Sequence, residues 1–363
     1  MTATPATDTP ALVPGARVAA DQIRFGVADP DHGLAGVRLW QEVGIPGDRL
    51  DFTCVQGGWA LSLDPPSVQR MQYLLELRHA DGRIEHVLDP ANPQRVRGVF
   101  GDHSVVEMPG YRSPWWLDAP AIDGRTTDLA APPARGLRRD LPVTVWQPED
   151  ATDTEALPLL VVHDGHEMAD LASLTRYSAA LVASDRLPRH RLALLHPLDR
   201  DAWYSASPAY GRSLTRSVLP LLRQRFAVRE PVAAAGASLG GLSLLHTEWE
   251  HPRSLGGLFL QSGSFFQLGT DPQEEGYPHF WRIHRFVRTV LDATHPPSRP
   301  HVALTCGTIE ENVHNNRVMA RWMSDHDYPV TYAEAPDVHT FTSWRDSFDP
   351  QLTDLLHRTW GTA

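Results

Sequence analysis

The feature that most constrains the fold of this chain is a change of pattern at residue 139. From there to residue 363, short apolar runs that read as strands alternate with longer stretches whose apolar residues recur at helical spacing. Several runs are continuously apolar, which is typical of parallel strands covered by helices on both faces. The runs are residues 141–148, 157–165, 191–198, 231–238, 255–263, 301–308 and 329–337. The sequence therefore predicts an α/β fold, with polar site residues just after the strand ends.

The preceding part of the chain, residues 21–117, carries a different pattern. Between residues 22 and 108 it consists of runs of seven to nine residues, several of them alternating, separated by turns rich in Gly, Pro and Asp. No helical period interrupts them, so we expect an immunoglobulin-like antiparallel β-sandwich. We also expect residues 1–20 to be disordered and residues 118–138, rich in Pro, Ala, Asp and Gly, to form a linker to a catalytic domain at 139–363.

The charge balance limits the partners of the protein. The net charge is −11, and none of the 33 basic residues is a lysine. Non-specific nucleic-acid binding needs a basic patch, which the sequence lacks, so we expect no nucleic-acid partner. An anionic substrate would need local arginines, because the overall field repels it.

No targeting or membrane segment is apparent in the sequence. No run approaches the ~20 apolar residues that span a bilayer, and the first residues lack the basic and apolar regions of a signal peptide. We therefore expect a cytoplasmic protein without a membrane partner. The two cysteines, Cys54 and Cys306, have no metal-ligand spacing and are expected to be small buried residues.

Ser238 lies between Gly236 and Gly240 in a G-x-S-x-G pattern. A strand of small residues precedes this serine and a helical stretch follows it, which is the context of a nucleophile elbow. Glycine leaves room beside such a tight turn because it has no Cβ. The pattern alone is weak, since a serine in close strand–helix packing would also produce it. Its context favours a nucleophile.

A nucleophilic serine needs a base and an orienting acid, which follow it in the order Asp/Glu, then His, in α/β-hydrolases. His339 follows the last predicted strand, whereas His326 falls in a helical stretch. His339 is therefore the predicted base. The loop after the preceding strand offers Glu310 and Glu311 as the acid, of which Glu310 is preferred. Asp337 is a weaker alternative, because it is too close to His339 along the chain to reach it easily.

An oxyanion hole needs two backbone N–H donors. The first predicted donor is Leu239, the residue after the nucleophile, and the second is His166, in the turn after an early strand. An ordinary Asp-Gly turn at residues 164–165 explains that second segment equally well.

Several segments resemble the enterochelin esterase and esterase D group of the α/β-hydrolases. They are residues 159–168 (LLVVHDGHEM), 236–241 (GASLGG), 306–312 (CGTIEEN), 337–347 (DVHTFTSWRDS) and 88–111 (LDPANPQRVRGVFGDHSVVEMPGY). The last of these is similar to the segment that joins the sandwich to the hydrolase domain in enterochelin esterases. The resemblance implies a cytoplasmic serine esterase, without metal or organic cofactor, that cuts the ester bonds of a catecholate siderophore and releases its iron. It also implies Ser238 as nucleophile, His339 as base and Glu310 as acid.

A polyanionic catecholate substrate calls for arginines in the site, and aromatic side chains could line the pocket for its acyl groups. The predicted substrate-binding residues are Arg176, Arg200, Arg212, Arg345, Trp203, Tyr204 and Trp344. A surface charge or core packing explains each of them singly. Ser217 replaces the glutamate of the group's Glu-Leu-Leu-Pro motif and Thr340 replaces the aspartate after the histidine. These departures leave the substrate open.

The sequence is also compatible with two other functions. The same chemistry could act on a feruloyl, acetyl or other small ester, including one linked to a carbohydrate. The chain could also be a catalytically silent binding protein on a hydrolase scaffold, which a complete set of catalytic residues makes the weaker alternative.

Overall fold

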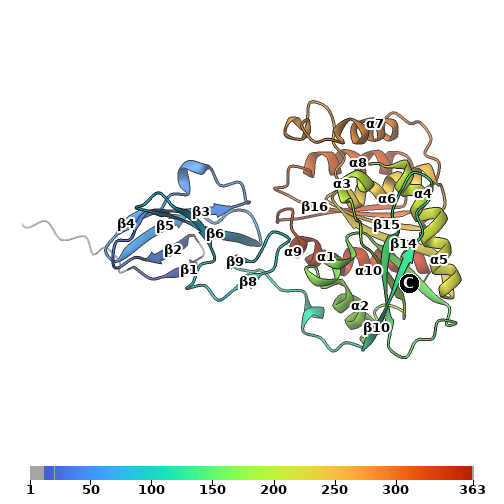
Figure 1. Cartoon of the computed structure of the whole chain (residues 1–363), viewed down its shortest axis with the longest axis horizontal. Helices are drawn as coiled ribbons and strands as arrows, with labels where there is room; N and C mark the ends of the chain where they lie inside the picture. Colours follow the sequence, from blue (N-terminus) through green and yellow to red (C-terminus); the bar gives the residue numbers. More distant parts are fainter. Residues whose placement is uncertain (1–11, 20, 362–363) are drawn as a thin grey trace, which may run out of the picture. The chain divides into compact units, whose positions relative to one another are not determined.

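The computed structural model describes residues 12–19 and 21–361 and divides the chain into two compact units (Figure 1). The first unit runs to Arg112 and also contains Pro336–Val338, and the second comprises Ser113–Ala335 with residues 339–363. Of the expected disordered segment 1–20, residues 1–11 and 20 lie outside the described residues, and Gly15–Val18 forms a strand. No helix in the described part of the chain is both long and apolar enough to cross a bilayer.

The first unit is a β-sandwich, as the alternating runs predicted. One antiparallel sheet has the order β1-β2-β5-β4 and the other the order β3-β6-β9-β8, with β7 paired to β6. The strands are β1 (Gly15–Val18), β2 (Ile23–Ala28), β3 (Leu34–Gln41), β4 (Thr53–Val55), β5 (Gly58–Leu63), β6 (Arg70–His79), β7 (Ile84–Val87), β8 (Arg95–Val96) and β9 (His103–Glu107). Phe25 of one sheet and Leu39 of the other belong to one buried cluster, so the two sheets share a core. Cys54 on β4 is exposed, contrary to expectation, because its side chain lies on a short edge strand.

The second unit contains one sheet of order β10-β11-β13-β12-β14-β15-β16-β17. Pairing is parallel from β13 through β17, and β10 and β11 are antiparallel. The strands are β10 (Gly124–Ala131), β11 (Leu141–Pro148), β12 (Leu157–Val162), β13 (Arg191–Leu195), β14 (Val228–Ala237), β15 (Gly257–Gln261), β16 (His301–Gly307) and β17 (Val330–Ala335). This confirms the predicted α/β-hydrolase fold.

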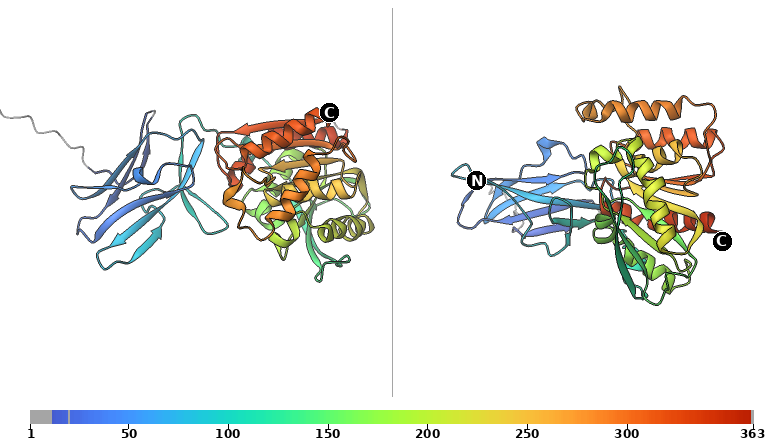
Figure 2. Two further views of the ribbon diagram at one scale, coloured as in Figure 1. Left: turned by 90° about the horizontal axis from the view of Figure 1, so that it is seen from above. Right: turned by 45° about the vertical axis from the view of Figure 1, so that its right-hand side comes forward.

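Helices cover both faces of this sheet, as two views of the ribbon show (Figure 2). They are α1 (Gly165–Asp170), α2 (Leu174–Ala183), α3 (Arg200–Tyr204), α4 (Pro208–Ser213), α5 (Leu219–Arg225), α6 (Leu239–Glu250), α7 (Phe280–Leu291), α8 (Val313–Asp325), α9 (Phe341–Asp346) and α10 (Thr353–Trp360). Short 3-10 turns lie at Gly47–Arg49, Trp115–Leu117 and Pro272–Glu274, and π turns at Leu214–Val218 and Phe348–Leu352.

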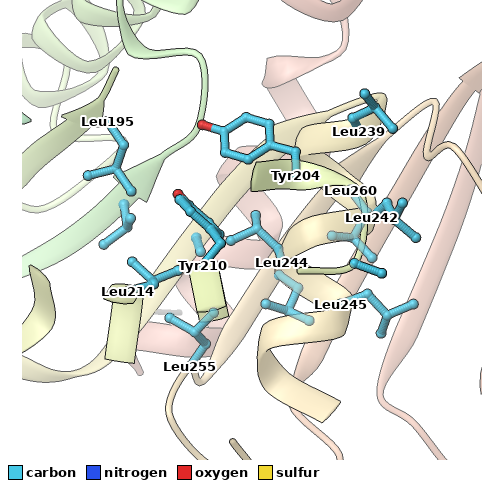
Figure 3. Close-up of a cluster of buried hydrophobic side chains, with 14 of the residues drawn as sticks. Leu195, Tyr204, Tyr210, Leu214, Leu239, Leu242, Leu244, Leu245, Leu255 and Leu260 are labelled. Carbon is cyan, nitrogen blue, oxygen red and sulfur yellow. The ribbon is translucent and has the colours of Figure 1, made fainter. Parts of the chain in front are cut away.

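The continuous apolar runs follow directly from this layering. On β12, Leu159 and Val161 join the core under α6, which Figure 3 shows in close-up, while Leu160 and Val162 join the core under α10. Successive strand residues point to opposite faces, so a strand buried on both faces is apolar at every position.

Residues 118–138, expected to form a linker, include strand β10, which pairs with β11 along its whole length. Its sequence, GRTTDLAA, has four consecutive polar residues and no apolar alternation, although every second residue is exposed. A strand with one face toward water needs apolar side chains on its other face only. The pattern is therefore too weak to distinguish this strand from a loop.

Candidate active site

Ser238 occupies a strained turn between a strand and a helix. Strand β14 ends at Ala237, helix α6 begins at Leu239, and Ser238 between them has φ 57° and ψ −124°. A residue with a Cβ pays on the order of 1–3 kcal/mol for a sparsely populated conformation of this kind, and such residues cluster at functional sites. The turn carries the side chain to the carboxyl end of the strand, where a nucleophile elbow presents its hydroxyl.

The flanking glycines are required by close backbone packing. A Cβ at Gly236 would lie 2.7 Å from the carbonyl carbon and oxygen of Gly240, and one at Gly241 would lie 3.1 Å from the carbonyl oxygen of Gly236. A Cβ at Gly240 would lie 3.2 Å from the Cβ of His163. A side chain at Gly236 would therefore force strand β14 and the first turn of α6 apart, whereas at Gly240 and Gly241 the neighbouring atoms would have to shift by a few tenths of an ångström.

We expect Gly236→Ala to destabilise the protein by about 1–3 kcal/mol, because its methyl group would collide with backbone that cannot move aside cheaply. Urea unfolding measures the change. Gly276→Ala is the matched control, since a Cβ there has no atom within 4 Å, and its stability should match that of the wild type. Equal losses in the two variants would contradict this account of the motif.

The predicted acid and base meet at the same edge of the sheet. Glu310 follows β16, His339 follows β17, and the Nδ1 atom of His339 lies 2.6 Å from Oε2 of Glu310. Glu311, the open alternative, is exposed, and Asp337 forms a 2.7 Å ion pair with Arg70 within the first unit. Of the three candidate carboxylates, Glu310 is the one in contact with the imidazole.

The Glu310 carboxylate is held on both sides. Its Oε1 atom accepts hydrogen bonds from the Gly307 N–H at 2.7 Å and from the Ser262 hydroxyl at 2.8 Å. The Ser262 hydroxyl in turn accepts a hydrogen bond from the indole N–H of Trp344 at 3.0 Å. The Trp344 ring also packs edge-on against His339, with centroids 4.9 Å apart. Both members of the acid–base pair therefore have fixed orientations.

The hydroxyl of Ser238 contacts a residue that the sequence analysis missed. Its Oγ atom lies 3.1 Å from Oγ of Ser264, a buried serine shortly after β15. Its position in the sequence could have indicated it, because Ser264 follows the end of a strand, as Ser238, Glu310 and His339 do.

The two predicted oxyanion donors are both in the first turn of a helix. Leu239 is the first residue of α6 and His166 the second of α1, and N–H groups of a first turn have no partner within their helix. The α1 turn begins at Asp164, which has φ 52° and whose carboxylate accepts two 2.8 Å hydrogen bonds from Arg200. This pair holds the turn that carries His166.

His163 links this turn to helix α6. Its imidazole is fully buried, with Nδ1 2.9 Å from the Gly240 carbonyl oxygen and Nε2 2.9 Å from the Tyr210 hydroxyl. Burial lowers the pKa of His163 to about 4, so the ring is neutral at pH 7. Nδ1–H therefore donates to Gly240, which ties the end of β12 to the first turn of α6, and Nε2 accepts from Tyr210 of α4.

The predicted substrate-binding residues are mostly engaged elsewhere. The guanidinium of Arg176 donates to the carbonyl oxygens of Leu117 and Ala119, and that of Arg212 donates to the carbonyl oxygen of Arg135. These contacts use some of the N–H donors of each guanidinium, and the role of Arg176 and Arg212 in binding an anion stays a prediction. Of the other predicted residues, Arg200 pairs with Asp164 and Arg345 pairs with Asp346. Trp203 and Tyr204 are buried in the core under α6. Trp344 packs against His339.

No group of three or more His, Cys, Asp or Glu side chains that could hold a metal ion occurs among residues 12–19 and 21–361. The buried Cys306 lies beside Glu310, and desolvation followed by that carboxylate raises the pKa of its thiol. Cys306 therefore remains a neutral thiol.

Comparison with known proteins places these features in a family. The Esterase family model, described as "Putative esterase", matches residues 134–358. The iron(III) enterobactin esterase of Escherichia coli (strain K12) is 27% identical over 267 residues, which cover 67% of this chain and 62% of that protein. The chain thus matches less than two thirds of the length of this curated relative.

Two solved structures share the fold. The ferric enterobactin esterase from Salmonella typhimurium superposes with a TM-score of 0.77 at 19% identity, covering 95% of this chain and 96% of that one. A ferulic acid esterase superposes with a TM-score of 0.54 at 16% identity, covering 67% of this chain and 99% of that one. The resemblance inferred from the sequence motifs is therefore confirmed at the level of family and fold.

Proposed function

The chain belongs to the Esterase family, and we propose that it is a serine esterase with Ser238 as its nucleophile. The observation that carries this proposal is the 2.6 Å contact between Glu310 and His339 at the edge of the sheet where the strained Ser238 turn also lies. Nucleophilic catalysis by serine requires a base, and the base requires a group that orients it.

In the proposed reaction, Ser238 Oγ attacks the carbonyl carbon of an ester while His339 Nε2 takes the hydroxyl proton. The Glu310 carboxylate fixes the Nδ1–H tautomer of His339 and stabilises the imidazolium that forms. The N–H groups of Leu239 and His166 donate to the oxyanion of the tetrahedral intermediate. The imidazolium returns its proton to the leaving alcohol, and a water molecule, activated by the same histidine, then releases the acyl group.

We propose an ester of a catecholate siderophore as the substrate, hydrolysed in the cytoplasm so that iron is released. Support comes from the relatives, since the curated sequence match and the full-length structural match are both named as enterobactin esterases.

A second candidate substrate is a small aryl or acetyl ester. The contacts of the predicted arginines favour this substrate. Arg176 and Arg212 already donate to backbone carbonyls, and the charge of Arg200 is balanced by Asp164. A site with few uncommitted arginines is less suited to a polyanion.

The test is labelling with a fluorophosphonate followed by a substrate panel. We expect the probe to modify Ser238, located by peptide mass spectrometry, and a protein that does not react would support the silent binding function instead. The panel compares ferric and iron-free triscatecholate lactones with feruloyl and acetyl sugar esters. Preference for the lactones by kcat/KM supports the siderophore substrate, and preference for the sugar esters overturns it.

A further inference from the structure

The turn that follows β15 contacts both ends of the proposed catalytic machinery. Ser262 donates to the Glu310 carboxylate at 2.8 Å, and two residues later the Ser264 hydroxyl lies 3.1 Å from the Ser238 hydroxyl. Both serines are buried, with 0% and 2% of their surface exposed, and Ser262 has φ 48°. A strained and buried turn between a nucleophile and its acid is a candidate for function.

Backbone hydrogen bonds hold this turn against the nucleophile. The Ser238 N–H donates to the Gln261 carbonyl at 2.8 Å, and the Ser264 N–H donates to the Ser238 carbonyl at 3.2 Å. The two serine residues are thereby joined at the main chain as well as at their hydroxyls. These main-chain bonds hold the two hydroxyls close together. The contact between them therefore does not depend on the free rotation of exposed side chains.

Two asparagines of the acid loop and α8 fix the middle of the turn. The buried Asn316 accepts from the Gly263 N–H at 2.9 Å and donates to the Gly263 carbonyl at 3.0 Å. Asn312 donates to the Ser262 carbonyl at 3.2 Å. Both polar groups of Gly263 are thus satisfied by one side chain, which leaves the turn little freedom to shift Ser264.

We propose that Ser264 is a further catalytic residue, whose hydroxyl donates a hydrogen bond to Ser238 Oγ during attack. This inference rests on the proposed function of Ser238. For His339 to act as base, the proton of Ser238 must point toward the imidazole, so in the contact between the two hydroxyls Ser264 is the donor. As the proton leaves, negative charge develops on Ser238 Oγ, and a donor already in place stabilises it without reorganisation. No bond to Ser264 forms or breaks.

The test compares Ser264→Ala and Ser264→Cys with the wild type, because neither variant retains a hydroxyl and the thiol is a weak donor. We expect the rate constant of inactivation by a fluorophosphonate and the kcat for a p-nitrophenyl ester to fall about tenfold in both, as loss of one hydrogen bond to a developing charge implies. KM and the thermal unfolding midpoint should stay unchanged. A merely structural role would instead lower the unfolding midpoint.

Ser178→Ala is the matched control. Ser178 is equally buried, in α2, and its hydroxyl has no hydrogen-bond partner within the described residues, so both rates should remain at the wild-type value. Ser264 variants that react with the probe as fast as the wild type would overturn the inference and leave the proposed function standing. A wild-type protein that does not react with the probe would overturn the proposed function itself.

Discussion

Ser238→Ala is expected to lower kcat for a short p-nitrophenyl ester by roughly 10⁴- to 10⁶-fold, the range found when a member of a catalytic triad is removed. Without its Oγ atom the protein cannot form an acyl-enzyme. His339, Glu310 and the two proposed oxyanion donors would still bind the ester and polarise its carbonyl group. The remaining rate therefore reports what those groups contribute without covalent catalysis.

The fold should survive this substitution, because Ser238 holds its place through its main chain. Its N–H donates to Gln261 and its carbonyl accepts from Ser264 and Leu242, and alanine preserves all three bonds. Steady-state kinetics measures the loss, with circular dichroism and urea unfolding as the checks on folding. A folded Ser238→Ala protein with wild-type kcat would assign the nucleophile to another residue.

The parts of the site that the sequence predicted are those with local signals. Ser238 lies in a short pattern with strand and helix on either side, and Glu310 and His339 each follow a strand. In a parallel sheet the carboxyl ends of the strands share one edge, so position along the chain alone places these residues together. The 2.6 Å contact of the acid and the base was predictable for that reason.

The parts that were missed depend on contacts between distant residues. Arg200 reaches Asp164 across 36 positions and Ser264 reaches Ser238 across 26, and neither pairing leaves a pattern in the sequence. The carbonyl partners of Arg176 were also missed, because they come from a segment, residues 117–119, with no periodicity of its own. Propensity and period describe short windows, whereas these side chains are placed by tertiary packing.

Acidification from pH 7 to pH 5 is expected to destabilise the protein strongly, because several histidines are buried as neutral rings. Burial lowers the pKa of His163, His190, His196 and His246 to about 4 each. At His190, Nδ1 is 2.8 Å from the Pro188 carbonyl oxygen, and Nε2 has no hydrogen-bond partner among the described residues. A proton added at Nε2 would therefore place an unpaired charge in the core.

The sign follows from the two pKa values. In the unfolded chain a histidine titrates near 6.5, so between pH 6.5 and about 4 the unfolded state binds more protons than the folded state. Stability is then complete above pH 6.5 and is lost as the pH falls toward the folded pKa, by about 1.4 kcal/mol per pH unit for each such histidine. Glu248 acts in the opposite direction, because burial raises the pKa of its carboxyl group.

At pH 5 the fully buried His163 and His190 should each have cost about 2 kcal/mol, which for the two together is a substantial part of the stability of a typical domain. Urea unfolding at half-unit steps of pH measures the slope. His190→Phe keeps an aromatic ring against Trp146 and Trp360 while removing one titrating group, so it should reduce the slope by about 1.4 kcal/mol per pH unit.

His295→Asn is the control for this substitution. His295 is exposed, so its ring meets water in both the folded and the unfolded states, and its removal should leave the slope unchanged. A free energy of unfolding that stays constant between pH 7 and pH 5 would mean that these histidines do not enter the core as neutral rings, and a His190→Phe slope equal to that of the wild type would mean the same for His190. His163 would then carry a proton on Nε2 and could no longer accept from Tyr210. The bond of His163 to Gly240 of α6 would remain, whereas its bond to Tyr210 of α4 would be lost.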